Sequence, residues 1–239
     1  MTAFEPSIYS SYGSYGNFGA WSSSGPSSLS KAGLDMLIKS EGIRGTIYDD
    51  KTGKSVSSYS EVQGYPTIAL GLYITPEMQS TYARYLKGGE ILSGSALQDV
   101  IDKTIQPREQ QLNKLLSGIP NVTQNQYDAL FSWLFNRGAS NKRLLNAIAK
   151  LRAGDVSGAG EDIAAAASAE SVPYIAARRV QESVLFLTGA NIGSTTSKVV
   201  GITLMSVGIA GILGAVYWRK KHRNPLNLSG SSHVSIYTE

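Results

Sequence analysis

Apolar residues in the central part of the chain recur mostly at the spacing of amphipathic helices. Leu34, Leu37 and Ile38 share the face of one such helix. Ser30 is a residue type that caps helix starts, and Gly42 suits a left-handed helix end. The same spacing predicts further helices over 96–105, 107–116, 123–135, 141–153, 156–169 and 174–187.

A small sheet is expected between the first helix and the others. Residues 46–48 and 67–70 read as extended segments, and residues 51–64 between them are rich in Gly, Ser and Lys. Because the strands precede most of the helices, the pattern predicts an α+β fold. Thr123 and Gln126 fit a capping box, and we expect the apolar helix that they open to be the central buried one.

Residues 199–218 form a run of twenty uncharged residues. As a helix this run would extend about 30 Å, the thickness of the hydrocarbon core of a bilayer, so it predicts a single transmembrane helix. The basic cluster 219–223 follows directly, and such clusters stay on the cytoplasmic side of bacterial membranes. The residues before the run are then expected on the opposite side.

The first 29 residues differ in composition from the rest. Ser and Gly predominate, aromatic residues are interleaved, and Glu5 is the single charge. Such a composition does not support a packed core, so residues 1–29 are interpreted as a flexible tail or as an adhesive arm whose aromatic residues dock on a partner protein. The opening residues lack the basic and apolar regions of a secretory signal peptide, and none is expected.

Net charge and the rare residue types limit the catalytic groups that the chain can supply. The 239 residues carry a net charge of +4, but residues 31–182 hold 17 Lys and Arg against 16 Asp and Glu, so the excess lies in the C-terminal tail. The absence of cysteine excludes disulfides, thiolate nucleophiles and Cys-ligated metals. His222 and His233 both lie in the tail, which excludes a Ser-His-Asp triad in the folded part. Carboxylates are the expected acid–base groups, with no metal or cofactor.

Two carboxylates stand in contrasting predicted environments. Glu41 follows Leu34 by seven residues on the apolar helix face, where burial is expected to raise its pKa and favour the protonated form. Asp50, beside Asp49, opens a turn where a carboxylate stays hydrated and ionised. Glycoside hydrolysis uses such a pair, one group protonating the leaving oxygen and the other handling water or the anomeric carbon. The spacing alone also fits helix caps or surface charges.

Four separated segments, in the same order, resemble the phage-type lysozymes, the muramidase endolysins of bacteriophages. They are Ser-Glu-Gly-Ile-Arg-Gly-Thr-Ile-Tyr-Asp-Asp at 40–50, Gly-Tyr-Pro-Thr-Ile-Ala-Leu-Gly at 64–71, the central helix at 121–139 and the closing helix at 178–189. The resemblance covers residues 34–189. It implies a lysozyme-like fold with a small antiparallel sheet and a mainly helical lobe.

The resemblance also implies roles for individual residues. It makes Glu41 the general acid, and it makes Asp50 and Thr67 the residues that hold and activate the attacking water. The reaction in that family inverts the anomeric centre, which requires carboxyl groups about 6.5–9.5 Å apart. Either Arg178 or Arg179 is expected to brace the acid across the substrate groove.

Two features depart from the family's pattern. Leu72 stands where the family usually has a histidine, and this change removes an ion pair of the fold rather than a group of the chemistry. Residues 51–64 lengthen the interval between Asp50 and Thr67 by roughly ten residues, and an insertion there is expected to form a lid over the groove or to reposition Asp50.

The sequence therefore predicts five parts. They are an N-terminal arm (1–29), a lysozyme-like catalytic domain (30–190), a linker (191–198), a transmembrane helix (199–218) and a basic, then polar, tail (219–239). The leading interpretation is a membrane-anchored peptidoglycan hydrolase that cleaves the β-1,4 bond between N-acetylmuramic acid and N-acetylglucosamine, for penetration or lysis of a host cell wall. A lytic transglycosylase is a close alternative, and so is a structural virion or membrane protein that binds glycan or other proteins without hydrolysis.

Partners and location follow from the same interpretation. Peptidoglycan and a lipid bilayer are the expected partners, together with capsid or other virion proteins through the arm and nucleic acid close to the basic tail. The expected location is a single-pass position in the membrane of a lipid-containing bacteriophage or in the host inner membrane, with the catalytic domain opposite the tail.

Overall fold

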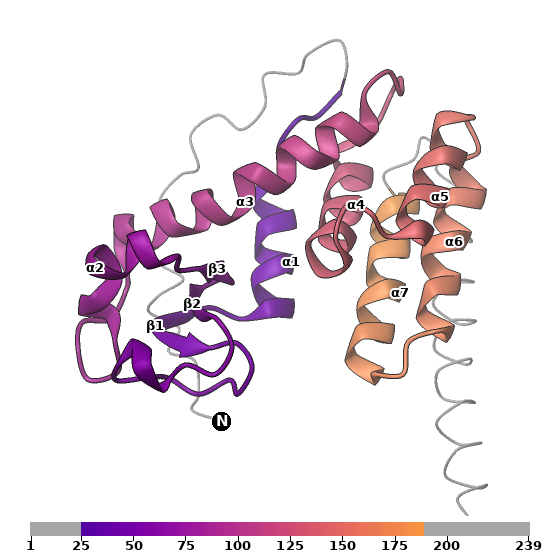
Figure 1. Cartoon of the computed structure of the whole chain (residues 1–239). Helices are drawn as coiled ribbons and strands as arrows, with labels where there is room; N and C mark the ends of the chain where they lie inside the picture. The colour runs from indigo at the N-terminus through magenta and orange to yellow at the C-terminus, as the bar shows by residue number, and fades with distance from the viewer. Residues whose placement is uncertain (1–24, 189–239) are drawn as a thin grey trace, which may run out of the picture.

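The computed structural model describes residues 25–188 (Figure 1). Its helices are α1 (Lys31–Glu41), α2 (Gln79–Tyr82), α3 (Gly94–Leu116), α4 (Gln124–Arg137), α5 (Lys142–Arg152), α6 (Val156–Ser168) and α7 (Pro173–Thr188). Its strands are β1 (Arg44–Asp49), β2 (Pro66–Ala69) and β3 (Leu72–Tyr73), with short 3₁₀ turns η2 (Tyr59–Glu61), η3 (Pro76–Met78) and η4 (Ala83–Tyr85).

The elements form two lobes joined by one long helix. Figure 1 shows the strands and α2 on one side, α4 to α7 on the other, α3 running along the top of both, and α1 between them. The three strands form one antiparallel sheet in the order β1-β2-β3. The expectation of an α+β fold with a small antiparallel sheet and a mainly helical lobe is confirmed.

Helix α4 lies at the centre of the helical lobe. The hydroxyl of Thr123 accepts from the backbone of Gln126, whose side chain in turn accepts from the backbone of Thr123, so the predicted capping box is present. Every residue of the stretch 126–134 is buried, and α4 packs against α1, α3, α5 and α7. The prediction that this helix is the central buried one is confirmed.

Helix α3 corrects one expectation. Separate helices were expected at 96–105 and 107–116, but a single helix passes through Pro107. Proline has no N–H group, so the helix lacks one backbone hydrogen bond at this position. In the same turn the Arg108 side chain adds a bond, from its Nη1 to the carbonyl oxygen of Thr104 at 2.6 Å. Buried residues on both sides of the proline, from Leu97 to Leu116, fix the two halves against the same core. Packing therefore outweighs the local cost of the proline.

Residues 51–64 are part of the sheet lobe. Val56 is buried, its N–H donates to the carbonyl oxygen of Ile47 at 3.1 Å, and its own carbonyl accepts from Lys87 at 2.8 Å. Ser55 forms an isolated bridge with Tyr48 of β1. Val56, in the middle of the segment, thus forms backbone hydrogen bonds with β1 on one side and with Lys87 on the other. This is the arrangement of a structural extension of the sheet and not of a free lid.

The residues that precede α1 are attached to the helical body. Leu29 is buried, and its N–H donates to Glu109 Oε1 on α3 at 2.7 Å. The carbonyl oxygen of Ser27 accepts from the Tyr127 hydroxyl on α4 at 3.0 Å. Residues 27–29, the end of the predicted arm, are thus held against α3 and α4.

Within residues 25–188, no helix combines the length and the apolar character that crossing a bilayer requires. The predicted transmembrane run at 199–218 lies outside the described residues, as do the linker, the tail and residues 1–24 of the arm.

Candidate active site

Glu41 is the last residue of α1, at the junction of the two lobes. The helix begins at Ser30, whose hydroxyl accepts from the N–H of Gly33 at 2.9 Å, and it ends where Gly42 adopts a φ of 76°. Both predicted ends are confirmed. Leu37 and Ile38, in the turn before Glu41, are buried in the core. Their packing fixes the end of the helix and therefore the position of the Glu41 carboxylate beside the sheet lobe.

The carboxylate of Glu41 is paired with Arg178 of α7. The Nη1 group of Arg178 donates to Glu41 Oε1, and the two side chains are 6% and 27% exposed, respectively. The expectation that Glu41 would lie among apolar groups is wrong. Its partner comes from a helix far along the chain, and the helical spacing around Glu41 contains no information about that contact.

A buried polar network fixes Arg178 in turn. Its Nε donates to Ser132 Oγ and to Glu182 Oε1, both at 3.1 Å, and its Nη2 donates to the Ser132 carbonyl oxygen at 2.9 Å. The Ser132 hydroxyl donates to Glu182 Oε1 at 2.6 Å. Burial raises the pKa of Glu182, and Arg179, Ser132 and Arg178 oppose that effect. The guanidinium group that reaches Glu41 is therefore held from three sides and has little freedom.

Arg179 points elsewhere. Its Nη1 donates to Glu182 Oε2 and its Nη2 to Asn136 Oδ1 at 2.7 Å, while its guanidinium lies over the ring of Trp133 at 5.4 Å from the centroid. Of the two adjacent arginines, Arg178 is thus the one in contact with Glu41, and Arg179 supports the helical lobe.

Asp49 and Asp50 have opposite environments, because successive side chains at the end of a strand point to opposite sides. Asp49 is 1% exposed and accepts from Thr52 Oγ1 at 2.8 Å and from the N–H of Gly64 at 2.8 Å. Burial acts to raise the pKa of Asp49, but hydrogen bonds from Thr52, Gly64 and Lys51 outweigh it and hold the pKa below its usual range. Asp50 is exposed, as the sequence predicted.

The backbone of Tyr65 fixes the orientation of Asp50. The N–H of Tyr65 donates to Asp50 Oδ1 at 2.6 Å, and the N–H of Asp50 donates to the Tyr65 carbonyl oxygen at 3.1 Å. Gly64 permits this approach, since a Cβ atom there would lie 2.1 Å from Asp50 Oδ1. One oxygen of the second carboxylate is consequently held by the backbone.

Thr67 is on β2, two residues after Tyr65. It is 6% exposed, and its hydroxyl donates to the Tyr65 carbonyl oxygen at 3.1 Å. Tyr65 therefore contacts both Asp50 and Thr67, which brings these two predicted site residues together although they are separated by the long insertion.

Tyr48 links the two carboxylates electrostatically. Burial raises the pKa of its phenol, the guanidinium of Arg44 opposes this from 4.5 Å above the ring, and the charges of Asp50 and Glu41 raise it further. Glu41 ends α1 and Asp50 directly follows β1, so the two carboxylates flank the strand that carries Tyr48.

Two residues that hold Arg178 in place, Ser132 and Glu182, were not predicted as part of the site. Glu182 follows Arg178 by four residues, the spacing of a helical ion pair, and Ser132 is a polar residue inside the apolar run of the central helix. Both signals were available.

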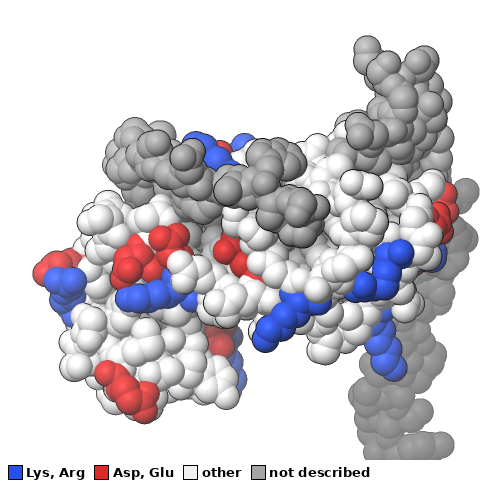
Figure 2. All heavy atoms as spheres, turned by 90° about the horizontal axis from the view of Figure 1, so that it is seen from above, with Lys and Arg blue, Asp and Glu red and all other residues white. Residues whose placement is uncertain are grey.

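The part of the chain that the structure describes is nearly balanced in charge, with 17 Lys and Arg against 16 Asp and Glu. Figure 2 shows basic and acidic side chains on the upper face of the molecule. Across residues 25–188, no group of three or more His, Cys, Asp or Glu side chains is arranged to hold a metal ion. The site is built from carboxylates, one hydroxyl and a guanidinium group.

The profile of the phage lysozyme family matches residues 39–182, which include Glu41, Asp50, Thr67 and Arg178. This chain belongs to the phage lysozyme family. It is accordingly a glycoside hydrolase of the muramidase class, and peptidoglycan is its substrate. The sequence-based assignment of the enzyme class is confirmed.

Solved structures similar to this lysozyme include a muramidase domain, a lysozyme and an endolysin. The muramidase domain of SpmX from Asticaccaulis excentricus is 23% identical with a TM-score of 0.48, covering 66% of this chain and 97% of that one. A point mutant of P22 lysozyme is 24% identical (TM-score 0.48; 67% and 98%), and the endolysin of Escherichia coli O157:H7 phage FAHEc1 is 23% identical (0.48; 66% and 92%). No match was found among curated proteins.

Proposed function

We propose that this lysozyme cleaves the β-1,4 bond between N-acetylmuramic acid and N-acetylglucosamine with inversion, using Glu41 as acid and Asp50 with Thr67 to activate water. The observation that supports this most is the contact of Glu41 with Arg178 of the helical lobe, while Asp50 and Thr67 are both held by Tyr65 in the sheet lobe. The proposal pairs this acid with a water site on Asp50 and Thr67.

Glu41 acts on the leaving group. Arg178 occupies Oε1, so Oε2 carries the proton that passes to the glycosidic oxygen as the bond to the anomeric carbon breaks. The carboxylate that remains is stabilised by the guanidinium group, whose position is already set by Ser132 and Glu182. No rearrangement of the charged groups is needed during the step.

Asp50 and Thr67 act on water from the other face of the sugar. The Tyr65 N–H occupies Asp50 Oδ1, which leaves Oδ2 to accept a proton from the water. The Thr67 hydroxyl donates its own proton to the Tyr65 carbonyl oxygen, so its oxygen accepts the second hydrogen of that water. A lone pair of the water oxygen then attacks the anomeric carbon. Room for the water requires carboxyl groups about 6.5–9.5 Å apart.

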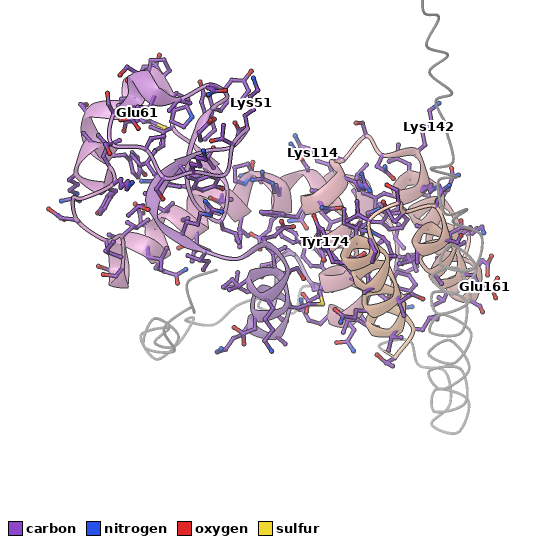
Figure 3. All side chains as sticks on the ribbon, turned by 90° about the horizontal axis from the view of Figure 1, so that it is seen from below. Lys51, Glu61, Lys114, Lys142, Glu161 and Tyr174 are labelled. Carbon is purple, nitrogen blue, oxygen red and sulfur yellow. The ribbon has the colours of Figure 1, made fainter. Side chains whose placement is uncertain are left out.

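Substitution of the acid tests this assignment. Glu41→Gln in the full-length chain is expected to release reducing ends from purified peptidoglycan at less than about a hundredth of the wild-type rate. Glu161→Gln, which changes an exposed glutamate on α6, is the matched control and is expected to retain full activity (Figure 3). Full lytic activity in Glu41→Gln would refute the assignment.

The products separate hydrolysis from transglycosylation. A transglycosylase uses the 6-hydroxyl of the muramic acid in place of water and leaves a 1,6-anhydro ring. The pairing of Asp50 with Thr67 through Tyr65 favours water as the nucleophile. Mass spectrometry of digested muropeptides is expected to show hydrated reducing ends, and anhydro products would support the transglycosylase instead.

We further propose that residues 199–218 anchor this lysozyme in a bilayer, with the catalytic domain opposite the basic tail at 219–223. The bilayer is a virion membrane or the host inner membrane, the arm at 1–29 contacts virion proteins, and the tail lies close to nucleic acid. Support comes from the apolar run and from charge asymmetry alone. Labelling of each terminus in intact and permeabilised particles tests the orientation, which an external C-terminus would contradict.

A further inference from the structure

Two exposed tyrosines beside the site have no part in the proposed chemistry. Tyr65 is 60% exposed and Tyr73 is 43% exposed, and their rings meet edge to face with centroids 5.1 Å apart and planes at 75°. Large aromatic side chains that contact one another while remaining open to solvent commonly form binding surfaces.

The register of the sheet places this pair next to Thr67. Thr67 and Tyr73 are directly opposed on β2 and β3, so their side chains lie on the same face of the sheet. Tyr65 precedes Thr67 by two residues, which in extended chain returns to that face. The two rings therefore share one sheet face with the hydroxyl that is proposed to hold the attacking water.

The backbone of Tyr65 also carries Asp50. Its N–H and carbonyl groups both bond to that aspartate, at 2.6 and 3.1 Å. The ring consequently projects from the same residue that orients the proposed base, and its position relative to the scissile bond is set by these two hydrogen bonds.

We propose that Tyr65 and Tyr73 form a sugar-binding platform on which one pyranose ring of the glycan strand packs beside the scissile bond. This inference rests on the proposed function, because it takes its substrate from that assignment. The axial C–H groups of a pyranose present an apolar face, and aromatic rings provide a rigid apolar surface of similar size, with hydroxyl groups at the rim for the sugar's polar edge.

The contact between the rings prepares this surface before the substrate arrives. The edge of one ring rests on the face of the other, which restricts rotation of both side chains and lowers the entropy lost on binding. The long insertion at 51–64 ends directly before Tyr65, and Gly64 is anchored to Asp49 at 2.8 Å, so the segment also supports the platform.

Binding by an inactive enzyme tests the platform independently of catalysis. In full-length Glu41→Gln protein, affinity for purified peptidoglycan sacculi is measured by co-sedimentation. Adding Tyr65→Ala or Tyr73→Ala is expected to weaken binding roughly tenfold, whereas Tyr65→Trp, which keeps an aromatic face, is expected to retain it. Leu145→Ala, at an apolar and partly exposed residue of α5, is the matched control and is expected to bind normally.

Kinetics in the active enzyme give a second readout. On soluble glycan strands Tyr73→Ala is expected to raise KM roughly tenfold with kcat within about twofold, and Tyr73→Trp is expected to keep the wild-type KM. Unchanged binding and KM in both alanine variants would overturn the platform, as would a Tyr65→Trp variant that fails like Tyr65→Ala. Full hydrolysis by Glu41→Gln would overturn the proposed catalytic assignment instead, and the binding comparison would still decide on the platform.

Discussion

Arg178 donates a hydrogen bond to Glu41 across 137 residues of chain. Glu41 ends the first helix and Arg178 lies in the last one, so their contact forms only when α7 has packed against α4 and α4 against α1. The position of the proposed acid therefore depends on closure of the whole helical lobe, and the buried group of Ser132 and Glu182 transmits that dependence to the site.

Replacing the arginine tests the bracing. Arg178→Lys keeps the positive charge but lacks the planar fork that reaches Glu41, Ser132 and Glu182 together. We expect a fall in kcat of roughly a hundredfold through misplacement of the acid, with native circular dichroism retained. Arg137→Lys, in a partly exposed pair with Glu170, is the control and is expected to keep its activity. Wild-type kcat in a folded Arg178→Lys enzyme would contradict the bracing.

Gly64→Ala tests how Asp50 is oriented. The added Cβ would fall 2.1 Å from Asp50 Oδ1, so the carboxylate must move away from the Tyr65 N–H. We expect at least a tenfold loss of kcat. In an Asp50→Ala background the same glycine change is expected to have little further effect on the rate, since the two changes act through one group. If the losses of kcat in the two single variants multiply in the double variant, Gly64 does not act through Asp50.

Asp49 makes stability depend on pH in the acid range. Its pKa is below the ordinary value of 3.8, so the unfolded chain binds a proton more readily than the folded one in that window. Stability is thus present above the ordinary value and is lost as the pH falls through the folded-state pKa. Asp49→Asn is expected to flatten the dependence of the urea midpoint on pH below about 4, whereas Asp99→Asn, in an exposed pair with Lys103, is expected to parallel the wild type. Parallel curves for Asp49→Asn would contradict this role.

Glu182 is expected to matter for folding more than any surface carboxylate. It is fully buried between two arginines, and Glu182→Gln would leave their charges without a counter-charge. The free energy of unfolding is expected to fall by about 3 kcal/mol. Glu90→Gln, in an exposed pair with Arg84 at 3.9 Å, is expected to change it by less than about 0.5 kcal/mol. Urea unfolding measures both, and equal effects would refute the network's role.

Local sequence signals predicted much of the fold because the structure uses them directly. The side chains of Ser30 and Thr123 cap the helices that they were predicted to begin. Gly42 ends the first helix with a positive φ, a conformation that glycine adopts readily. The predicted helix break at Pro107 was wrong. The preference of proline against helix is outweighed by the burial of residues on both sides of it, and burial cannot be read from a short stretch of sequence.

The site was predictable only in part. Glu41, Asp50 and Thr67 were identified as candidates from motifs, but the partner of Glu41 lies 137 residues further along the chain. The choice between Arg178 and Arg179 was open because neighbouring helical residues differ by about 100° in direction, and only packing of α7 decides which faces Glu41. The exposed Tyr65–Tyr73 pair depends on the register of β2 with β3, which the short strands did not reveal.

The central claim is that Glu41 and Asp50 act on opposite faces of one sugar with water as the nucleophile. The most direct test is proton NMR of purified glycan strands during the first minutes of digestion, before mutarotation mixes the anomers. The new reducing ends are expected to appear as the α-anomer with the wild-type enzyme, and none is expected with Glu41→Gln. Initial formation of the β-anomer, or of the same product by Glu41→Gln, would contradict it.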